Sequence, residues 1–299
     1  MGKARFKKDL FQISIDGPVA AGKGTVARIL AERLGWLYVD TGAMYRAAAL
    51  LAKRAGVFFD DPKAIASLVE RSHFEMRNPT DTERDGRLTT LVVDGEDVSW
   101  KIRTEEFSRG SSLVAAHQGV RRALVEKQQK IATIHNVVME GRDITFRVLP
   151  KAQLKIFLTA SEEERAKRRH HQLIERGVDA DYETVFEDLR ARDRRDSERG
   201  TDPLHIVEDK TNFPVKVFTD KFKVLVLNNG KKKIIEARKH LPSLRKHRDP
   251  NILEKYCMRY YVMKIYKIGK TELRVLNTKD FVEMMEKLVA KNITIYHVK

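Results

Sequence analysis

Residues 11–25 read Phe11-Gln12-Ile13-Ser14-Ile15-Asp16-Gly17-Pro18-Val19-Ala20-Ala21-Gly22-Lys23-Gly24-Thr25. The apolar run at the start predicts a strand, which ends where glycine and proline interrupt regular pairing. The glycine-rich part matches G-x-x-x-x-G-K, a loop whose backbone N–H groups face a phosphate while the lysine adds a positive charge. After Lys23, apolar residues recur at helical spacing as far as Leu34. The stretch therefore predicts a strand, a phosphate-binding loop and a helix, in that order.

The loop predicts where a nucleoside triphosphate binds. The residues of the expected ATP site are Gly17, Pro18, Val19, Ala20, Ala21, Gly22, Lys23, Gly24 and Thr25. Gly24 stands where such loops usually carry serine or threonine, and Thr25 follows one position later. A loop hydroxyl is therefore not expected to bind magnesium directly, and no residue is assigned as a metal ligand.

Strand and helix patterns alternate along most of the chain. Further strands are predicted at residues 36–39, 136–139, 154–158 and 224–227. This alternation predicts an α/β fold with a doubly wound parallel sheet. Residues 73–98 break the rhythm, because short strand patterns there are separated by Asp-Gly turns. We expect them to form a small inserted antiparallel unit.

The composition is that of a globular chain of 299 residues, with 42% apolar and 33% charged residues. No stretch approaches the roughly eighteen uninterrupted apolar residues of a membrane helix, so no membrane association is expected. The one cysteine, Cys257, cannot form an internal disulfide. A reducing, cytoplasmic location is therefore expected. The net charge of +16 favours polyanionic partners such as nucleotides or nucleic acids.

Arginines indicate what receives the phosphate. A guanidinium matches both a phosphate dianion and the charge that develops on a transferring phosphoryl group. Arginines occur at Arg46, Arg121 and Arg142 and in the run from Arg192 to Arg199. We expect them to share one edge of the sheet. A protein that only binds a nucleotide has no use for a second phosphate cradle, so the pattern favours an enzyme.

The order of the motifs resembles that of the bacterial cytidylate kinase family over about residues 11–241. Beyond the loop, the resemblance rests on Val39-Asp40-Thr41-Gly42-Ala43-Met44-Tyr45-Arg46, Asp94-Gly95-Glu96-Asp97-Val98, Ile102-Arg103-Thr104-Glu105, Ser112-Leu113-Val114-Ala115-Ala116, Val120-Arg121, Gly141-Arg142-Asp143 and the Arg192 to Arg199 run followed by Pro203-Leu204. It implies a P-loop nucleoside monophosphate kinase that transfers the γ-phosphate of ATP to CMP or dCMP.

The resemblance also implies roles for single residues. The cytosine ring would be faced by Thr41, Arg121 and Asp143, the acceptor phosphate would be held by Arg46, Arg142 and Arg199, and the sugar would lie near Ser112, Arg192 and Asp196. The catalytic residues would be Lys23, Arg142, Arg192 and Arg199. A basic helix opening at Ser161 looks like the family's lid, whose Arg165, Arg168 and Arg169 would close over ATP.

The chemistry of the bases agrees with these roles. Cytosine presents an amino donor that a carboxylate such as Asp143 can accept, whereas uracil presents an acceptor that it would repel. The acceptor phosphate is already anionic at neutral pH, so no strong general base is needed. Mg2+ would bridge the oxygens of the donor phosphates.

The chain is expected to divide after Leu241. Residues 1–241 would form the kinase-like domain, which contains an acceptor insert at about 72–112 and a lid at about 161–200. A basic linker would cover residues 242–257. Residues 258–299 are predicted to form a small ββαβ module of unknown role, with two strands around residues 268–270, a helix at 278–291 and a last strand at 293–296.

The basic tail leaves alternatives open. Residues 242–299 carry thirteen lysines and arginines against six acidic residues, so weak contact with RNA is conceivable, although packing on the kinase or self-association is favoured. A P-loop kinase for UMP or another small acceptor, and a nucleotide-dependent RNA-binding protein, are the alternatives to a CMP kinase. Because every assigned residue lies between Gly17 and Arg199, deleting residues 242–299 is expected to leave CMP phosphorylation mostly unchanged, unless the tail covers an apolar face.

Overall fold

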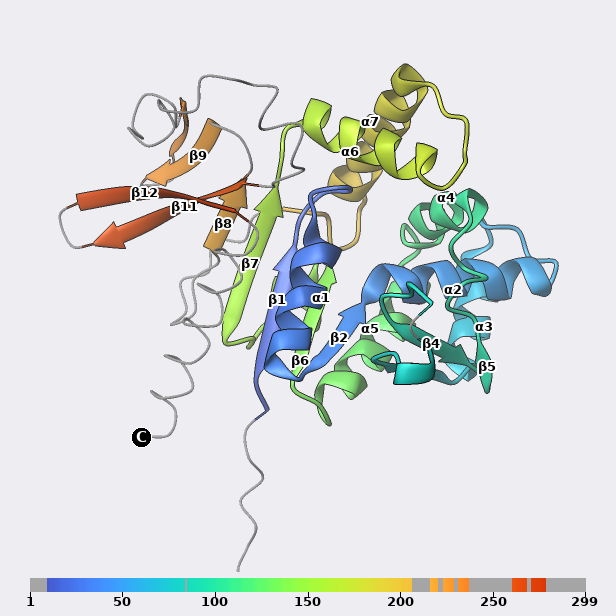
Figure 1. Cartoon of the computed structure of the whole chain (residues 1–299). Helices are drawn as coiled ribbons and strands as arrows, with labels where there is room; N and C mark the ends of the chain where they lie inside the picture. Colours follow the sequence, from blue (N-terminus) through green and yellow to red (C-terminus); the bar gives the residue numbers. More distant parts are fainter. Residues whose placement is uncertain are drawn as a thin grey trace, which may run out of the picture.

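The apolar run before the glycine-rich loop forms the middle one of the five parallel strands of the main sheet (Figure 1). The structure is a computed structural model that describes residues 10–83 and 85–205 in full and, beyond them, the backbone of five strands. β1 (Gln12–Asp16) pairs in parallel with β6 (Val137–Gly141) on one side and with β7 (Leu154–Thr159) on the other. The predicted strand before the loop is thus confirmed.

Two further strands complete the parallel part of the sheet. β2 (Leu37–Asp40) lies beyond β6, and β8 (Lys216–Thr219) lies beyond β7. The parallel strands therefore follow the order β8-β7-β1-β6-β2. Because their carboxyl ends share one edge, the loops after β1, β2 and β6 come together there, as ligand sites of such sheets require.

Helices cover both faces of this sheet. α1 (Lys23–Leu34) packs against one face together with Ile13 and Ile15 of β1. α2 (Thr41–Arg54) and α5 (Gln118–Ala132) pack on the other face with Val137 and Met139 of β6. Successive strand residues point to opposite faces, so both faces of the strands can be apolar. The predicted doubly wound α/β fold is confirmed.

The remaining helical elements are α3 (Pro62–Arg71), α4 (Glu105–Val114), α6 (Glu162–Ile174), α7 (Tyr182–Glu198), a 3-10 turn at Asp81–Glu83 and a π turn at Ile144–Val148. α6 begins as its sequence predicts, because the Ser161 hydroxyl accepts the N–H of Glu164 at 3.3 Å. α6 and α7 pack against each other, and together they make up most of the region predicted as the lid.

The predicted antiparallel insert is also present. β3 (Phe74–Arg77), β4 (Thr90–Val93) and β5 (Glu96–Asp97) form a three-stranded antiparallel sheet. Asp94 and Gly95 both have positive φ, 50° and 84°, at the turn between β4 and β5. Such a turn favours Asp-Gly because glycine adopts the left-handed region without steric cost.

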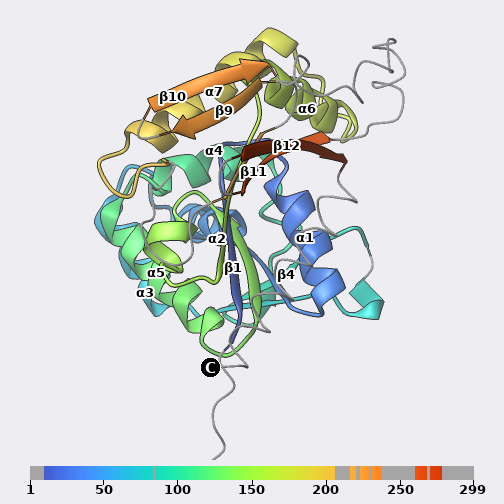
Figure 2. The same cartoon turned by 90° about the vertical axis from the view of Figure 1, so that its left-hand side faces the viewer.

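The prediction of a core strand at residues 224–227 was wrong in its placement. These residues lie in β9 (Lys223–Asn228), which pairs with β10 (Lys231–Glu236) in a separate antiparallel sheet (Figure 2). β8 occupies the expected place in the main sheet instead. The Asn-Gly pair at residues 229–230 is typical of two-residue hairpins, so the sequence itself favours pairing between the strands on either side of it.

The two strands expected around residues 268–270 are present. β11 (Tyr260–Lys267) pairs with β12 (Lys270–Asn277), and β11 also meets β8 in antiparallel orientation at Val262 and Thr219. The main sheet thereby extends to seven strands. The predicted linker at 242–257, the helix at 278–291 and the strand at 293–296 lie outside the described residues, and the division into domains stays a prediction. In the described part of the chain, no helix is long and apolar enough to cross a membrane.

The pairing of β11 with β8 changes the expected effect of truncation. Deleting residues 242–299 removes β11 and leaves the edge of β8 without its neighbour. We expect the truncated protein to melt at a lower temperature and to aggregate more readily, while the kinetic constants of its folded fraction stay within about twofold of the full chain. Thermal unfolding and steady-state kinetics on both forms test this. A fall in activity per folded molecule would place the tail in the function of the site.

Candidate active site

The glycine-rich loop curls between β1 and α1, and two of its positions have a backbone conformation that favours glycine. Gly17 has a φ of 151°, and a Cβ atom there would lie 1.8 Å from the backbone oxygen of Leu158. Gly22 precedes α1 in the left-handed region, with a φ of 95°. α1 begins directly afterwards at Lys23, so the N–H groups of its first turn are available to an anion.

Asp16 connects this loop to the loop that follows β6. Its carboxylate is fully buried and accepts the backbone N–H groups of Ile144 at 2.9 Å and Thr145 at 2.8 Å. Burial raises the pKa of Asp16 to about 6. Because Arg142 and Asp143 directly precede these two amides, the contact fixes the phosphate loop relative to both residues.

Lys23 is buried inside the site, where both Arg142 and nearby carboxylates act on its charge. Its Nζ donates to the backbone oxygen of Pro18 at 2.8 Å, and only 5% of the residue is exposed. Burial first, and then the charge of Arg142, lower the pKa of Lys23 to about 7. An anion bound beside the loop would therefore restore the charged form of the lysine.

Four predicted phosphate-binding and catalytic arginines surround the opposite side of the site. Arg46 pairs with Asp40 at 2.8 Å, and Arg142 pairs with Asp196 at 2.8 Å. Arg199 lies 4.0 Å from Asp196. Burial and the charge of Arg142 lower the pKa of Arg192 to about 10. Positive charge is thus concentrated here beyond what the neighbouring carboxylates balance.

The residues predicted to read the base form a buried cluster. Arg121, which is 1% exposed, pairs with Asp143, and its Nε donates to Asp202 at 3.3 Å. Burial raises the pKa of Asp143, although Arg121 and Arg199 oppose this effect. Thr41 lies nearby and donates its hydroxyl to the backbone oxygen of Glu140 at 2.7 Å.

One cavity of about 420 Å³ brings most of the predicted residues together. The predicted residues that line it are Val19, Ala20, Ala21, Gly22, Lys23, Gly24, Thr25, Thr41, Arg46, Ser112, Arg121, Arg142, Asp143, Arg169, Arg192, Asp196 and Arg199. Gly17, Pro18, Arg165 and Arg168 lie outside its lining. The loop that was expected to bind ATP and the residues expected to bind CMP therefore share a single space.

Two of the predicted lid arginines contact the phosphate loop through its backbone. Arg165 donates to the backbone oxygen of Val19 at 3.2 Å and pairs with Asp193 at 2.5 Å. Arg168 lies 3.5 Å from the backbone oxygen of Ala21. The proposed closing of these side chains over ATP stays a prediction.

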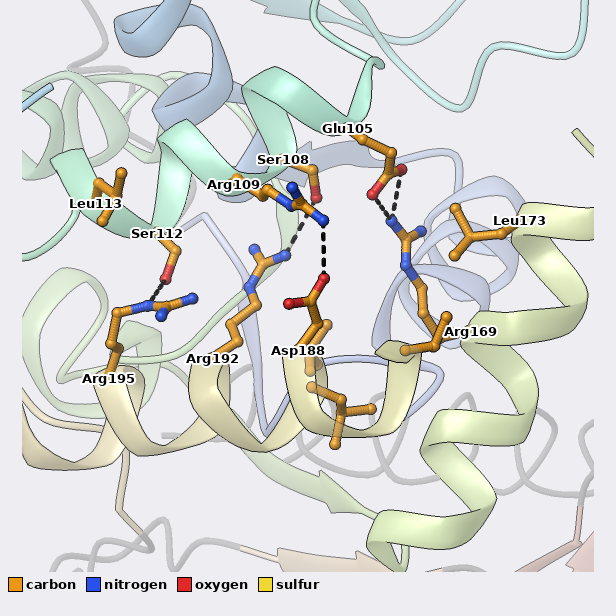
Figure 3. Close-up of a pocket in the computed structure, with 13 residues that line it drawn as sticks. Glu105, Ser108, Arg109, Ser112, Leu113, Arg169, Leu173, Asp188, Arg192 and Arg195 are labelled. Carbon is orange, nitrogen blue, oxygen red and sulfur yellow. Dashed lines mark hydrogen bonds and ion pairs between the residues drawn. The ribbon is translucent and has the colours of Figure 1, made fainter. Parts of the chain in front are cut away.

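A neighbouring hollow of about 350 Å³ separates α4 from α6 and α7 (Figure 3). Side chains from both sides meet across it. The contacts are Arg169 with Glu105 at 2.6 Å, Arg109 with Asp188 at 3.0 Å, Arg192 with Ser108 at 3.3 Å and Arg195 with Ser112 at 3.1 Å. Ser112 thus contacts Arg195, and Arg192 contacts Ser108. The resemblance had placed Ser112 and Arg192 together near the sugar, but here each of them hydrogen-bonds a different residue.

Several residues that line the cavity were not predicted from the sequence to have a role in the site. Asp40, Arg103 and Glu140 line it, and none of them had been assigned a role. Asp40 and Glu140 follow the general rule that residues at the carboxyl ends of parallel strands reach the ligand, because they lie at the ends of β2 and β6. That signal was available in the sequence.

Glu140 also explains the unusual glycine of the loop. A Cβ atom at Gly24 would lie 2.9 Å from Oε1 of Glu140 and 3.2 Å from the Tyr38 hydroxyl, which itself donates to Glu140 at 2.8 Å. The space that a serine or threonine side chain would fill is therefore occupied by the Glu140–Tyr38 pair.

The fold and the site define a P-loop protein in which one cavity joins a phosphate loop to a second cluster of arginines. More narrowly, the chain belongs to the cytidylate kinase family, because the family model described as Cytidylate kinase matches residues 13–219. The resemblance stated from the motifs is thereby confirmed.

Individual relatives agree with this membership. A cytidylate kinase from Geobacillus sp. is 48% identical over 66% of this chain and 86% of its own length. Those from Bacillus subtilis and Lactobacillus gasseri are 46% and 41% identical and match 66% and 74% of this chain, and 85% and 96% of their own lengths.

Two solved structures also match. A shikimate kinase from Acinetobacter baumannii is 16% identical, with 84% of this chain and 97% of that chain covered. TT1252 from Thermus thermophilus is 19% identical, with 65% of this chain and 86% of that chain covered. The TM-score is 0.29 in each comparison.

Replacing the loop lysine tests its part in phosphoryl transfer. Lys23→Ala is expected to lower kcat at least about 100-fold, because the ammonium neutralises charge that develops on the transferring group. The melting temperature should change little, since Lys23 donates only to Pro18 within the loop. Near-normal turnover with ATP would contradict the assignment of the loop.

The lowered pKa of Lys23 predicts that ATP binding takes up a proton. At about pH 8 the lysine of the free protein is mostly neutral, because its pKa is about 7, whereas bound phosphates would restore its charge. Titration calorimetry in two buffers of different ionisation enthalpy measures this uptake. The Lys23→Arg variant should bind ATP without it, because a guanidinium keeps its charge at this pH. Equal proton uptake by both proteins would assign the proton to another group.

Proposed function

We propose that this protein transfers the γ-phosphate of ATP to CMP or dCMP, yielding ADP and CDP or dCDP. The observation that carries the proposal is the single cavity that the phosphate loop shares with the acceptor-side arginines and with the buried Arg121–Asp143 pair. An enzyme that only hydrolyses ATP would need no second phosphate site and no buried groups to read a base.

ATP would bind with its phosphates on the loop between β1 and α1. The curled backbone directs N–H groups toward them, the first turn of α1 adds its dipole, and Lys23 contributes a full charge. Arg169 of α6 lines the same cavity and is close enough to contribute a further charge once its pair with Glu105 opens. Arg165 and Arg168 would hold the lid over the loop.

The acceptor phosphate would bind between Arg46, Arg142 and Arg199. Arg46 in particular is not saturated by its carboxylate partner, because its buried Nε has no hydrogen-bond partner among the described residues. A phosphate dianion would supply the missing acceptors, because each guanidinium presents several donors in a fixed plane. Arg192 and Asp196 would lie beside the sugar, with Ser112 near them.

The cytosine ring would lie against Arg121 and Asp143. A carboxylate accepts the amino group of cytosine, and a guanidinium donates to its ring acceptors. Thr41 borders the same end of the cavity. Uracil would place an acceptor against the Asp143 carboxylate, which makes UMP the poorer acceptor.

In this arrangement, the reaction consists of alignment and charge neutralisation. An oxygen of the acceptor phosphate forms a bond to the γ-phosphorus as the bond to the β-phosphate bridging oxygen breaks, and that electron pair leaves with ADP. Lys23 and Arg142 lie near each other and would stabilise the charge on the group in transit. Asp143 takes no proton in this scheme.

The residues present fit a magnesium ion carried by ATP. Asp40 and Glu140 both line the cavity beside the loop. Burial first, and then the charge of Asp40, raise the pKa of Glu140, so a cation between them would relieve their repulsion. Among the described residues, no group of three or more His, Cys, Asp and Glu side chains could hold a metal. The ion would therefore depend mainly on phosphate oxygens and water, and it would offset the charge of the donor phosphates.

Nucleotides are the only partners that an observation supports. The lysines and arginines behind the RNA alternative lie in residues 242–299, outside the residues whose side chains the structure describes, and no finding favours RNA contact. A cytoplasmic location stays a prediction from the single cysteine. An ADP-release assay with CMP, dCMP, UMP and AMP separates the proposal from a kinase for another acceptor.

Replacing Asp143 tests how the base is read. Asp143→Asn is expected to lower the ratio of kcat/KM for CMP to that for UMP at least about tenfold, because an amide can present either a donor or an acceptor. The melting temperature should fall as well, since the buried Arg121 loses its charged partner. Rates are therefore compared per folded molecule.

A matched control for this experiment is Asp60→Asn, at an exposed position outside the cavity. It should leave the ratio unchanged. If Asp143→Asn also leaves the CMP to UMP ratio unchanged, Asp143 does not read the base. Equal losses with both acceptors would assign it a structural role.

A further inference from the structure

Arg103 stands out among the residues of the cavity that have no assigned role. It lies within the acceptor insert, between β5 and α4 and directly before Thr104, which caps α4 by accepting the N–H of Phe107. Its side chain lines the same cavity as the phosphate loop and Arg46. The insert thus contributes a guanidinium of its own to the space where the acceptor would bind.

The surroundings of Arg103 leave its charge without a dedicated partner. Its Nε is buried and has no hydrogen-bond partner in the part of the chain that the structure describes. Asp40 is the carboxylate that acts on it most strongly, yet Asp40 already accepts the N–H of Ala43 at 3.0 Å and pairs with Arg46 at 2.8 Å. A partly buried guanidinium with a buried, unpaired Nε is stabilised when an anion joins it.

Other arginines of the cavity differ in this respect. Arg121 pairs with Asp143, Arg142 pairs with Asp196 at 2.8 Å, and Arg169 pairs with Glu105 at 2.6 Å. Each of these has a carboxylate at ion-pair distance. Among the described residues, no carboxylate lies at that distance from Arg103. Arg103 is therefore better suited than these three to accept an incoming anion.

The neighbours of Arg103 indicate which anion. The groups that act on its charge are Asp40, Arg46, Tyr38 and Arg176, after the effect of burial, which lowers its pKa. Arg46 of α2 is one of the arginines assigned to the acceptor phosphate, so Arg103 lies beside a residue of that part of the cavity. Arg176, the remaining group, follows α6 and also lines the cavity.

On these grounds we infer that Arg103 binds the phosphate of the acceptor nucleotide together with Arg46. This inference rests on the proposed function, since it names a further residue of the same site. Phosphate would supply acceptor oxygens to the buried Nε atoms of both guanidiniums, which have no hydrogen-bond partner among the described residues. Binding of the acceptor would then join the insert to the main sheet through one shared anion.

Comparing CMP with cytidine isolates this contact, because the two ligands differ only in the phosphate. By titration calorimetry, Arg103→Gln should weaken CMP binding at least about tenfold while cytidine binding stays within about twofold. Arg103→Lys should fall between the two proteins, since an ammonium keeps the charge but loses the planar fork. Arg122→Gln serves as the matched control, because Arg122 is exposed on α5 and lies 3.7 Å from Glu70.

Steady-state kinetics provide a second readout. In Arg103→Gln the KM for CMP should rise at least about tenfold, while the KM for ATP should stay within about twofold. Equal losses of CMP and cytidine affinity would overturn the inference and make Arg103 a residue that only shapes the insert. A rise in the KM for ATP alone would overturn it in favour of the donor side.

Failure of the proposed function is recognised separately. If the unmodified protein neither binds nor phosphorylates CMP, the proposed function fails, and the role of Arg103 in holding that acceptor fails with it. If the unmodified protein phosphorylates CMP and Arg103→Gln does so with an unchanged KM, only the role of Arg103 is lost. Melting temperatures of all variants identify any that fail to fold, in which case Arg103→Lys decides.

Discussion

The carboxylate of Asp16 accepts two backbone N–H groups from residues that lie far away in the sequence, and the geometry of the site depends on this contact. Asp16 is the last residue of β1, and the phosphate loop begins at the next position. The amides that it binds, those of Ile144 and Thr145, directly follow Arg142 and Asp143. A single buried group therefore fixes the spacing between the loop for the donor and the residues for the acceptor. Its raised pKa reflects the cost of burying the carboxylate, which the two hydrogen bonds partly offset.

Around this fixed point the site accumulates positive charge in a partly buried space. Lys23 and Arg192 both have lowered pKa values, with burial as the main cause and Arg142 as the next. Such an arrangement is unfavourable for the empty protein and becomes favourable when phosphates enter. The buried positive charge therefore lowers the stability of the empty protein and raises its affinity for phosphates, as is common where charged ligands are bound. The buried Nε atoms of Arg46, Arg103 and Arg192 have no hydrogen-bond partner among the described residues, which is the same feature at the level of single atoms.

Much of the fold and of the candidate site could be predicted from the sequence, for physical reasons that differ from element to element. The strand, loop and helix at residues 11–34 follow from local patterns, because glycine positions and helical periodicity act over short distances. The placement of residues 224–227 failed because an apolar run of four residues does not specify which strand it pairs with, and β8 took the place in the sheet. The partners of Ser112 and Arg192 could not be predicted, since they depend on how α4 meets α7 across more than eighty positions of sequence. Arg103 was missed because its significance comes from what surrounds it in space, whereas Glu140 could have been found from its place at the end of a predicted parallel strand.

Two of the four contacts that cross the hollow between α4 and the two lid helices are ion pairs, and the one between Arg109 and Asp188 is open to solvent. The side chains of Arg109 and Asp188 are 72% and 60% exposed. Attraction between exposed charges weakens as salt accumulates around them, over a screening distance of about 8 Å in physiological solution. Hydrophobic contacts, by contrast, would hold the same helices together regardless of ionic strength. The attraction between Arg109 and Asp188 therefore depends on the ionic strength of the solution, whereas the packing of Leu173, Val185 and Leu189 beside the same hollow does not rely on charge.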